Sequence, residues 1–536
     1  MKKKLIVLAT LMAIVPSAFA ASGPQDIIPV PVKYEIFMEE YFPKVDGSDV
    51  RVHLGDKRFL KEINSLNIPE FARNEAYKLA VGKKGIDIFA VSEAGVYRAK
   101  TSLGMMMDKD SILTRCVILD YPRFRHRGLM LDISRNFRDK DFILKQLDAM
   151  AAVKMSTLHL HLTDDAGWRI QIDAYPELTR KAAWRVGRNF EEWRELGRQY
   201  SEEGSPLASG GYLTKADVKE IVEYAAARHI DIIPEIELPG HSGEVLAAYP
   251  ELACLRHDGG RRISGDLCPG KDKTFEMFER ILDEVIEMFP YEYVHIGGDE
   301  AGKQAWKNCP KCRRRMADEE LKNEDELQSY LICRVEKFLN GHGRKLLGWD
   351  EIMEGGLAPN ATVMVWRGEE GGGRAVKAGH RVVMTPGKFC YLDSYQDAPQ
   401  FQPEASGGYL PLANVYSYDP VSPAFTEEEA KLIYGVQGNL WAEYIPTDEH
   451  YEYMAYLLAI AEVAGREPAN KSYPDFHGRV CQEIGWLRDR GYHPFPLEQE
   501  LGERPEAKER VVHLALGKPV VYNAPYNEHY KAQGDK

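Results

Sequence analysis

The chain has 536 residues, of which 44% are hydrophobic and 28% charged, so we expect a globular protein of two or three domains. The formal net charge of −13 excludes the basic surface that is typical of nucleic-acid-binding proteins.

The first twenty residues have the pattern of a secretory signal peptide. Three lysines at positions 2–4 precede the apolar run LIVLATLMAIV, and Ala18-Phe19-Ala20 is a small-x-small cleavage site. The run is shorter than the about 20 residues that span a bilayer, so a membrane anchor is disfavoured, and no later segment has a transmembrane pattern. We therefore expect cleavage after Ala20, export to the periplasm, the cell surface or the medium, and no membrane span in the mature chain.

Residues 21–120 have the pattern of a small α+β domain. The segments VRVHL, AYKLAV and GIDIFAV alternate apolar and polar residues, which predicts half-buried strands. The segment from Glu93 to Met107 predicts a helix, and Tyr121-Pro122 marks the boundary to the next domain.

Residues 121–494 alternate short apolar runs with longer amphipathic ones. The predicted strands are GLMLDIS, TLHLHLTDD, DIIPEIEL, YVHIGGDE, KLLGWDE, TVMVWRG, RVVMTP and GVQGNLWAEY. Helical segments between them, such as KDFILKQLDAMAAV and KTFEMFERILDEVIEMF, repeat apolar residues three and four apart. This alternation predicts a parallel sheet, as either a (β/α)8 barrel or a doubly wound open sheet. Because the strands end in polar or aromatic residues, we favour the barrel, which gathers all its strand ends at one mouth.

Two segments stand outside this alternation. Residues 187–212 form a long polar insertion, a candidate lid or specificity loop. Residues 495–536 are charged and poor in apolar periodicity, so we expect a C-terminal extension that is dispensable for activity.

The eight cysteines would lie in an oxidising compartment if the chain is exported. Cys254 and Cys268 flank a polar segment and could join it by a disulfide, and Cys309 and Cys312 form a CPKC motif. Zinc needs four ligands, and no second CxxC or HxxxH follows this motif. We therefore expect a local structural disulfide there; a redox role is the alternative.

The pair Asp299-Glu300 is the main candidate for catalysis. It follows Gly297 and Gly298 at the end of an apolar strand, which places two carboxylates at the barrel mouth. Paired carboxylates serve glycoside hydrolysis, in which one donates a proton to the leaving oxygen. A capping or salt-bridged pair is the structural alternative, but the many other acids at strand ends disfavour it.

Other strand ends carry candidate binding residues. Three tryptophans, Trp349, Trp366 and Trp441, follow separate strands and could form an aromatic pocket, while Tyr391 and Asp393 follow the seventh strand. Since there is no HExxH motif and no loop with regularly spaced oxygen ligands, we expect no metal and no cofactor.

The motifs RGLMLDISR, HLHLTDDAGWR, PEIELPGH, HIGGDE, GWDE, VWRG, YLD and NLWAEY, in this order, resemble glycoside hydrolase family 20. The segments IIPVPVKYE and EAGVYRAKTSL resemble the accessory domain of that family, and the likeness spans about residues 27 to 465. Two residues depart from the family pattern. Ala166 stands where that family often has Gln or Pro, and Gly465 stands where it commonly has Trp. The resemblance implies a (β/α)8 TIM barrel preceded by a small α+β domain. It implies a secreted bacterial β-N-acetylhexosaminidase that acts on oligosaccharides or glycoconjugates ending in N-acetylglucosamine or N-acetylgalactosamine.

The resemblance also implies roles for individual residues. Glu300 would be the general acid and base, and Asp299 would orient the 2-acetamido group of the substrate, which acts as the nucleophile. The residues expected to bind the sugar or tune the acids are Arg135, Asp164, His241, Trp349, Trp366, Tyr391, Asp393, Trp441 and Glu443. A catalytically silent carbohydrate-binding protein and an enzyme for disaccharide units or internal linkages are the alternatives.

Overall fold

The computed structural model describes residues 23–41, 48–107, 112–256, 260–262, 265–397, 399, 402–454 and 456–497. The predicted signal peptide and nearly all of the C-terminal extension lie outside these residues. No helix in the described ranges is both long enough and apolar enough to cross a membrane.

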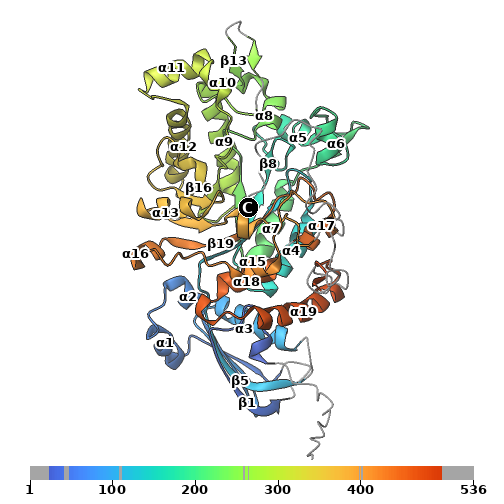
Figure 1. Cartoon of the computed structure of the whole chain (residues 1–536), viewed down its shortest axis with the longest axis vertical. Helices are drawn as coiled ribbons and strands as arrows, with labels where there is room; N and C mark the ends of the chain where they lie inside the picture. The colour runs from blue at the N-terminus through green and yellow to red at the C-terminus, as the bar shows by residue number, and fades with distance from the viewer. Residues whose placement is uncertain are drawn as a thin grey trace, which may run out of the picture. The chain divides into compact units, whose positions relative to one another are not determined.

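A five-stranded sheet forms the N-terminal part of the described chain (Figure 1). Its order is β1 (Lys33–Tyr41), β5 (Leu113–Asp120), β3 (Tyr77–Gly82), β4 (Gly85–Ala90) and β2 (Val50–Leu54). The helices α1 (Lys57–Asn64), α2 (Glu70–Glu75) and α3 (Glu93–Met107) accompany it. Buried and partly exposed residues alternate along β3, so one face of this strand belongs to the core. The sequence predicted β2, β3, β4 and α3, but not the partner strands β1 and β5.

Eight parallel strands close into a barrel, which confirms the predicted (β/α)8 fold and shows that the open-sheet alternative is wrong. Around the barrel they are β6 (His126–Asp132), β7 (Thr157–His161), β12 (Asp231–Glu235), β15 (Tyr293–His295), β16 (Lys345–Trp349), β17 (Thr362–Val365), β18 (Val382–Met384) and β19 (Ile433–Leu440). In register, Asp132 pairs with His161, His161 with Glu235 and Glu235 with His295, so polar residues meet at the carboxyl ends of neighbouring strands.

Amphipathic helices connect most of the strands. The longer ones are α4 (Lys140–Ala152), α7 (Lys215–Ala226), α9 (Asp272–Met288), α12 (Glu324–Gly341) and α13 (Glu369–Lys377). Two further helices, α18 (Leu457–Gly465) and α19 (Tyr473–Asp489), follow the last strand. Side chains cap the first turn of several of these helices. At the start of α7, the Thr214 side chain accepts a hydrogen bond from the backbone N–H of Asp217. Between β16 and β17 the described chain has only the 3-10 helix η3 (Asp350–Met353), and this short connection holds two acids of the barrel mouth.

Short elements complete the chain between these units. They are η1 (Pro24–Asp26), β8 (Thr163–Asp164), β9 (Gly167–Trp168), α5 (Glu177–Arg180), α8 (Gly243–Ala248), η2 (Pro250–Leu252), β13 (Cys254–Leu255), β14 (Arg261–Arg262), α10 (Gln304–Lys307), α11 (Pro310–Asp318), α14 (Gly387–Cys390), α15 (Leu412–Ser417), α16 (Glu427–Ala430), α17 (Asp448–Met454) and η5 (Pro468–Asn470).

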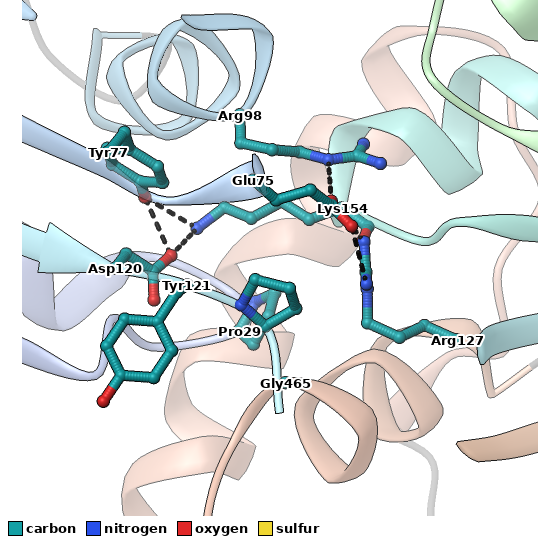
Figure 2. A pocket seen from close by; sticks show the side chains of 10 residues that line it. Pro29, Glu75, Tyr77, Arg98, Asp120, Tyr121, Arg127, Lys154 and Gly465 are labelled. Carbon is teal, nitrogen blue, oxygen red and sulfur yellow. Dashed lines mark hydrogen bonds and ion pairs between the residues drawn. The ribbon is translucent and has the colours of Figure 1, made fainter. Parts of the chain in front are cut away.

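Buried charges join the N-terminal sheet to the barrel (Figure 2). Glu75 accepts hydrogen bonds from Arg98 of α3 at 2.9 Å and from Arg127 of β6 at 2.7 Å. Lys154, at the end of α4, donates to Asp120 and to the Tyr77 hydroxyl. These buried ion pairs fix the N-terminal sheet against the barrel, because breaking one of them would leave a buried charge without its partner.

Gly465 lines this junction, and a Cβ at this position would lie 2.6 Å from Pro29 Cγ (Figure 2). Pro29 therefore occupies the space that a larger side chain at position 465 would need.

The insertion at residues 187–212 is an ordered lobe with its own small sheet. The strands β10 (Trp184–Val186) and β11 (Ala208–Gly210) pair, and α6 (Phe190–Glu195) lies between them. Trp193 of α6 is 1% exposed, with its ring 5.7 Å from Phe190 and 5.9 Å from Tyr200. Tyr200 donates a hydrogen bond to the Asp165 carbonyl at 2.6 Å, which anchors the lobe beside the barrel mouth.

Cys254, Cys268, Cys309 and Cys312 form no disulfides, so the predicted disulfides between Cys254 and Cys268 and within the CPKC motif are wrong. The tertiary structure gathers the sulfurs of Cys254, Cys268, Cys309 and Cys312 into one buried cluster instead.

Candidate active site

A pocket opens at the carboxyl ends of the barrel strands, with an empty volume of about 590 Å³. Its lining residues are Arg135, His241, Asp299, Glu300, Trp349, Trp366, Tyr391, Asp393, Ser406, Trp441 and Glu443. The structure thus brings all the predicted site residues except Asp164 to the lining of one pocket, and Asp164 lies directly behind this lining, in contact with Arg135 and His241.

Backbone geometry after β15 presents the acid pair. Gly297 and Gly298 have φ values of +65° and +93°, and Glu300 itself has a φ of +47°, a left-handed conformation that is unfavourable for a residue with a Cβ. A Cβ at Gly297 would lie 1.7 Å from an oxygen of Glu237. The first glycine is therefore required both by the turn and by the buried acid behind it.

His241 lies between the two acids. Its Nε2 is 3.4 Å from an oxygen of Asp299 and 3.4 Å from an oxygen of Glu300, while its Nδ1 is 3.3 Å from Asp164. Burial alone would lower the pKa of His241, but the charges of Asp164 and Asp299 outweigh burial and hold that pKa well above its usual range. The contact with His241 in turn lowers the pKa of Glu300.

The two acids differ in their exposure. The Glu300 side chain is 60% exposed, whereas that of Asp299 is 12% exposed. The Oδ1 atom of Asp299 has no hydrogen-bond partner among the described residues, although it is buried. Because a buried acceptor without a partner is costly, this atom is suited to receive a donor from a ligand.

Arg135, which follows β6, is the main cation of the pocket. Its guanidinium lies 2.8 Å from Asp164 and 3.7 Å from Glu443, and its Cζ is 4.7 Å from the centre of the Trp441 ring. The guanidinium is fixed by acids on two sides and by an aromatic face on a third. It can therefore present its remaining N–H donors in one direction.

Aromatic rings form the other wall. Trp366 stacks on Tyr391 with ring centres 6.0 Å apart, and Trp441 lies edge-on to Tyr391 at 6.1 Å and 5.6 Å from Trp349. Trp349 is 1% exposed and donates to Glu235 at 2.8 Å, so the floor of the aromatic wall is held from below.

A buried layer of histidines and acids supports the pocket. Glu235 contacts His159 at 3.1 Å, His295 at 2.8 Å and His161 through a short hydrogen bond. Burial would raise the pKa of Glu235, but the three imidazoles hold it well below its usual range. Burial and the charges of Asp299 and Glu235 raise the pKa of Glu237, behind the acid pair, well above its usual range.

Two buried acids in or beside the pocket also have raised pKa values. Burial raises the pKa of Asp393 to about 7, with a further contribution from Glu443, although a hydrogen bond from Ser406 opposes the shift. Burial and the charge of Asp299 raise the pKa of Glu351 to about 7, and Glu351 accepts a hydrogen bond from the Trp366 indole at 3.0 Å.

The sequence analysis did not assign several of these residues to the site. The missed residues are His161, Glu235, Glu237, Glu351 and Ser406. A signal was present for four of them, because HLHL, PEIEL and GWDE put polar residues into otherwise apolar strands or at their ends. Ser406 comes from a long loop without such a pattern.

Residues 124–467 match glycosyl hydrolase family 20, catalytic domain. The chain belongs to glycosyl hydrolase family 20. A β-hexosaminidase of Porphyromonas gingivalis is 42% identical over 450 residues, which are 80% of this chain and 56% of that protein. A β-hexosaminidase of Vibrio furnissii is 36% identical over 403 residues, which are 72% of this chain and 64% of that protein. The chain thus spans less than two thirds of the length of these two family 20 relatives.

A solved family 20 structure has the same fold. The exo β-N-acetylglucosaminidase from Vibrio harveyi, crystallised in complex with N-acetylglucosamine, superimposes with a TM-score of 0.74 and 28% identity, over 89% of this chain and 80% of that chain. A β-N-acetylhexosaminidase from Bacteroides fragilis gives a TM-score of 0.72 and 28% identity, over 88% and 97% of the two chains.

Proposed function

We propose that this chain is an exo-acting β-N-acetylhexosaminidase that removes terminal N-acetylglucosamine or N-acetylgalactosamine with retention of configuration, and that the substrate's own acetamido group is the nucleophile. The observation that carries the proposal is the buried, unpartnered Oδ1 of Asp299 beside the more exposed Glu300. In this proposal Asp299 accepts an amide N–H of the substrate, and Glu300 donates to the leaving group.

The reaction would run in two steps. Glu300 donates a proton to the glycosidic oxygen as the C1–O bond breaks, and the acetamido oxygen attacks C1 to form an oxazolinium ring. Asp299 accepts the acetamido N–H and stabilises the positive charge, while the Tyr391 hydroxyl donates to the acetamido oxygen. Water then attacks C1, gives its proton to Glu300 and reopens the ring. This is the substrate-assisted exception to the two-carboxylate mechanism, and it gains from proximity within one molecule.

His241 supports both roles of Glu300. In the open pocket its charge lowers the pKa of Glu300. A bound sugar would replace water around this carboxylate, and loss of solvent raises a carboxyl pKa. Sugar binding would therefore favour the protonated form that the first step needs.

Recognition of one terminal sugar fits the other pocket residues. Arg135, Asp393 and Glu443 offer donors and acceptors for ring hydroxyls, and Trp349, Trp366 and Trp441 offer apolar faces for the sugar ring and the acetamido methyl group. The proposed substrate is thus an oligosaccharide or glycoconjugate with a terminal N-acetylhexosamine. The similar enzyme from Vibrio harveyi is an exo β-N-acetylglucosaminidase, and its structure contains bound N-acetylglucosamine.

The test compares p-nitrophenyl N-acetyl-β-glucosaminide with p-nitrophenyl β-glucoside, which has a 2-hydroxyl instead of the acetamido group. We expect the first to be cleaved and the second to be a very poor substrate. Equal cleavage of both would contradict the acetamido mechanism, and cleavage of neither would favour a silent binding protein. On a chitin oligosaccharide we expect the monosaccharide from the earliest time points, whereas disaccharides or internal fragments would contradict exo action.

Two variants separate the roles of the acids. Glu300→Gln should lose about 100- to 10,000-fold with natural linkages and much less with activated aryl groups, which need little acid help. Asp299→Asn keeps the shape but removes the charge, so its defect should persist whatever group leaves. Recovery of Asp299→Asn with better leaving groups would refute its assigned role.

We also propose that the chain is exported, because residues 1–20 combine a basic start, an apolar run and a small-x-small site. N-terminal sequencing of the mature cellular protein should begin at Ala21, and an N-terminus at Met1 would contradict this.

A further inference from the structure

Four cysteine sulfurs converge in a buried cluster outside the pocket. We define the four-cysteine cluster as Cys254, Cys268, Cys309 and Cys312, all of which are 0% exposed. Their sulfurs all lie within 4.8 Å of one another. The sulfur–sulfur distances are 3.7 Å from Cys254 to Cys312, 3.7 Å from Cys268 to Cys309 and 3.5 Å from Cys268 to Cys312.

These separations fit a shared metal ion and not disulfides. A disulfide joins two sulfurs at about 2.05 Å, and none of the measured separations is close to that length. In a tetrahedral site with a Zn–S distance of about 2.3 Å, neighbouring sulfurs are roughly 3.8 Å apart. The cluster therefore already has nearly the size of a zinc tetrathiolate site.

We propose that the four-cysteine cluster binds one structural zinc ion. Four thiolates in a closed tetrahedral arrangement prefer zinc among the common divalent ions, and a site with no open position is structural rather than catalytic. Cys309 and Cys312, at the start of α11, supply two of the four ligands. Cys254 in β13 and Cys268 further along the same segment supply the other two.

The surroundings stabilise negative charge on the sulfurs. Cys309 is the residue before α11, and Cys312 is in its first turn, where the unpaired N–H groups of a helix favour anions. The backbone N–H of Leu255 donates to the sulfur of Cys309 at 3.5 Å. Lys271 donates to the carbonyls of Glu251 and Ala253, which brings a cation close to the chain that carries Cys254.

The zinc ion would join two loops of the active site. The loop after β12 carries His241 and Cys268, and the loop after β15 carries Glu300 and Cys309. Hydrogen bonds already link the loops, from the Gly302 amide to Asp266 at 3.0 Å and from the Trp306 indole to the Leu267 carbonyl at 2.8 Å. A metal at the cluster would fix this contact and with it the distance between His241 and Glu300. The inference does not depend on the substrate or the mechanism proposed above.

The test is the metal content of the full chain, purified without chelators and measured by mass spectrometry of the elements. We expect about one zinc per chain. A mercurial reagent that titrates the thiols should release this zinc to a chromogenic chelator in equal amount. After removal of the metal, cobalt chloride should restore one equivalent and give the visible absorption bands of a tetrahedral cobalt thiolate.

Cys254→Ser and Cys312→Ser should each lose most of the bound zinc and the cobalt bands. The matched control is Cys116→Ser, which removes a thiol that is also 0% exposed but lies in β5, outside the cluster. This variant should keep its zinc. If the cluster variants do not fold, the metal content and thiol titration of the unmodified chain decide alone.

Three results would overturn the proposal. The first is that the chain contains no zinc and takes up none when zinc chloride is added. The second is that peptide mapping finds the four cysteines joined as disulfides. The third is that the chain contains iron in place of zinc. Loss of zinc from a Cys116→Ser control that is still folded would be a fourth contrary result, because it would place the metal elsewhere.

Discussion

Replacing Glu351 by Gln should stabilise the protein at alkaline pH and leave it unchanged in acid. Glu351 lies in η3 and is 7% exposed. Burial and the charge of Asp299 raise its pKa from the ordinary 4.5 to about 7. The folded protein therefore holds a proton that the unfolded chain has released between these pH values, so stability falls as pH rises through this window.

The magnitude follows from the pKa. A rise of about 2.5 pKa units, at 1.36 kcal/mol each, corresponds to about 3 kcal/mol of stability that is present below pH 4.5 and lost above pH 7. Glutamine cannot ionise, yet its amide oxygen can still accept the hydrogen bond from Trp366. We expect the variant to match the unmodified protein at pH 4.5 and to exceed its free energy of unfolding by up to about 3 kcal/mol at pH 8.

The assay is denaturant unfolding of both proteins across this pH range. Glu354→Gln is the control of opposite sign, because Glu354 pairs with Arg367 and Lys303, which lower its pKa against the effect of its partial burial. This control should lose stability at neutral pH and not in acid. A Glu351→Gln protein that is no more stable than the unmodified one at pH 8, or a gain that is the same at every pH, would refute the reasoning.

Three further substitutions test other parts of the structure. Glu75→Gln removes the counter-charge of Arg98 and Arg127, so the free energy of unfolding should fall by about 3–5 kcal/mol, and a loss below about 1 kcal/mol would contradict a buried ion pair. Gly297→Ala should abolish most activity, because its Cβ would meet Glu237. The control Gly343→Ala should retain activity, because Gly343 also has a positive φ, of +70°, but no atom lies within 4 Å of a new Cβ there. Equal activity of the two variants would show that Glu237 can move aside. Trp193→Ala empties the core of the inserted lobe, so hydrogen exchange should accelerate in residues 184–212. Turnover of the aryl substrate should remain near normal. A marked loss of this turnover would mean that the lobe supports catalysis.

The barrel could be predicted because each strand carries its own signal. Buried parallel strands are continuous apolar runs, and the helices between them have a different period, so local patterns suffice. The edge strand β1 was missed because its sequence, KYEIFMEEY, mixes charged and apolar residues without a clear alternation. A strand at the edge of a sheet has one partner, β5, and its pairing is decided by that contact more than by its own sequence.

The pocket residues could be predicted for a related reason. A residue at the carboxyl end of a barrel strand reaches the mouth whatever the length of the loops, so Trp349, Trp366 and Trp441 were found from position alone. Ser406 could not be found in this way, because it contacts Asp393 only through the path of its loop. The same holds for the roles of Glu235 and Glu237, whose opposite pKa shifts depend on which neighbours the barrel register places beside them.

The cysteines show where spacing along the chain misleads. Cys309 and Cys312 are three residues apart, and Cys254 and Cys268 are fourteen apart, so each pair by itself suggested a local disulfide. The contacts that the structure contains join the pairs to each other, across 58 residues for Cys254 and Cys312 and 44 for Cys268 and Cys312. Those contacts exist because β12 and β15 are neighbours in the barrel, which brings the loops after them together. A ligand set divided between two loops of a barrel is thus visible only once the order of the strands is known.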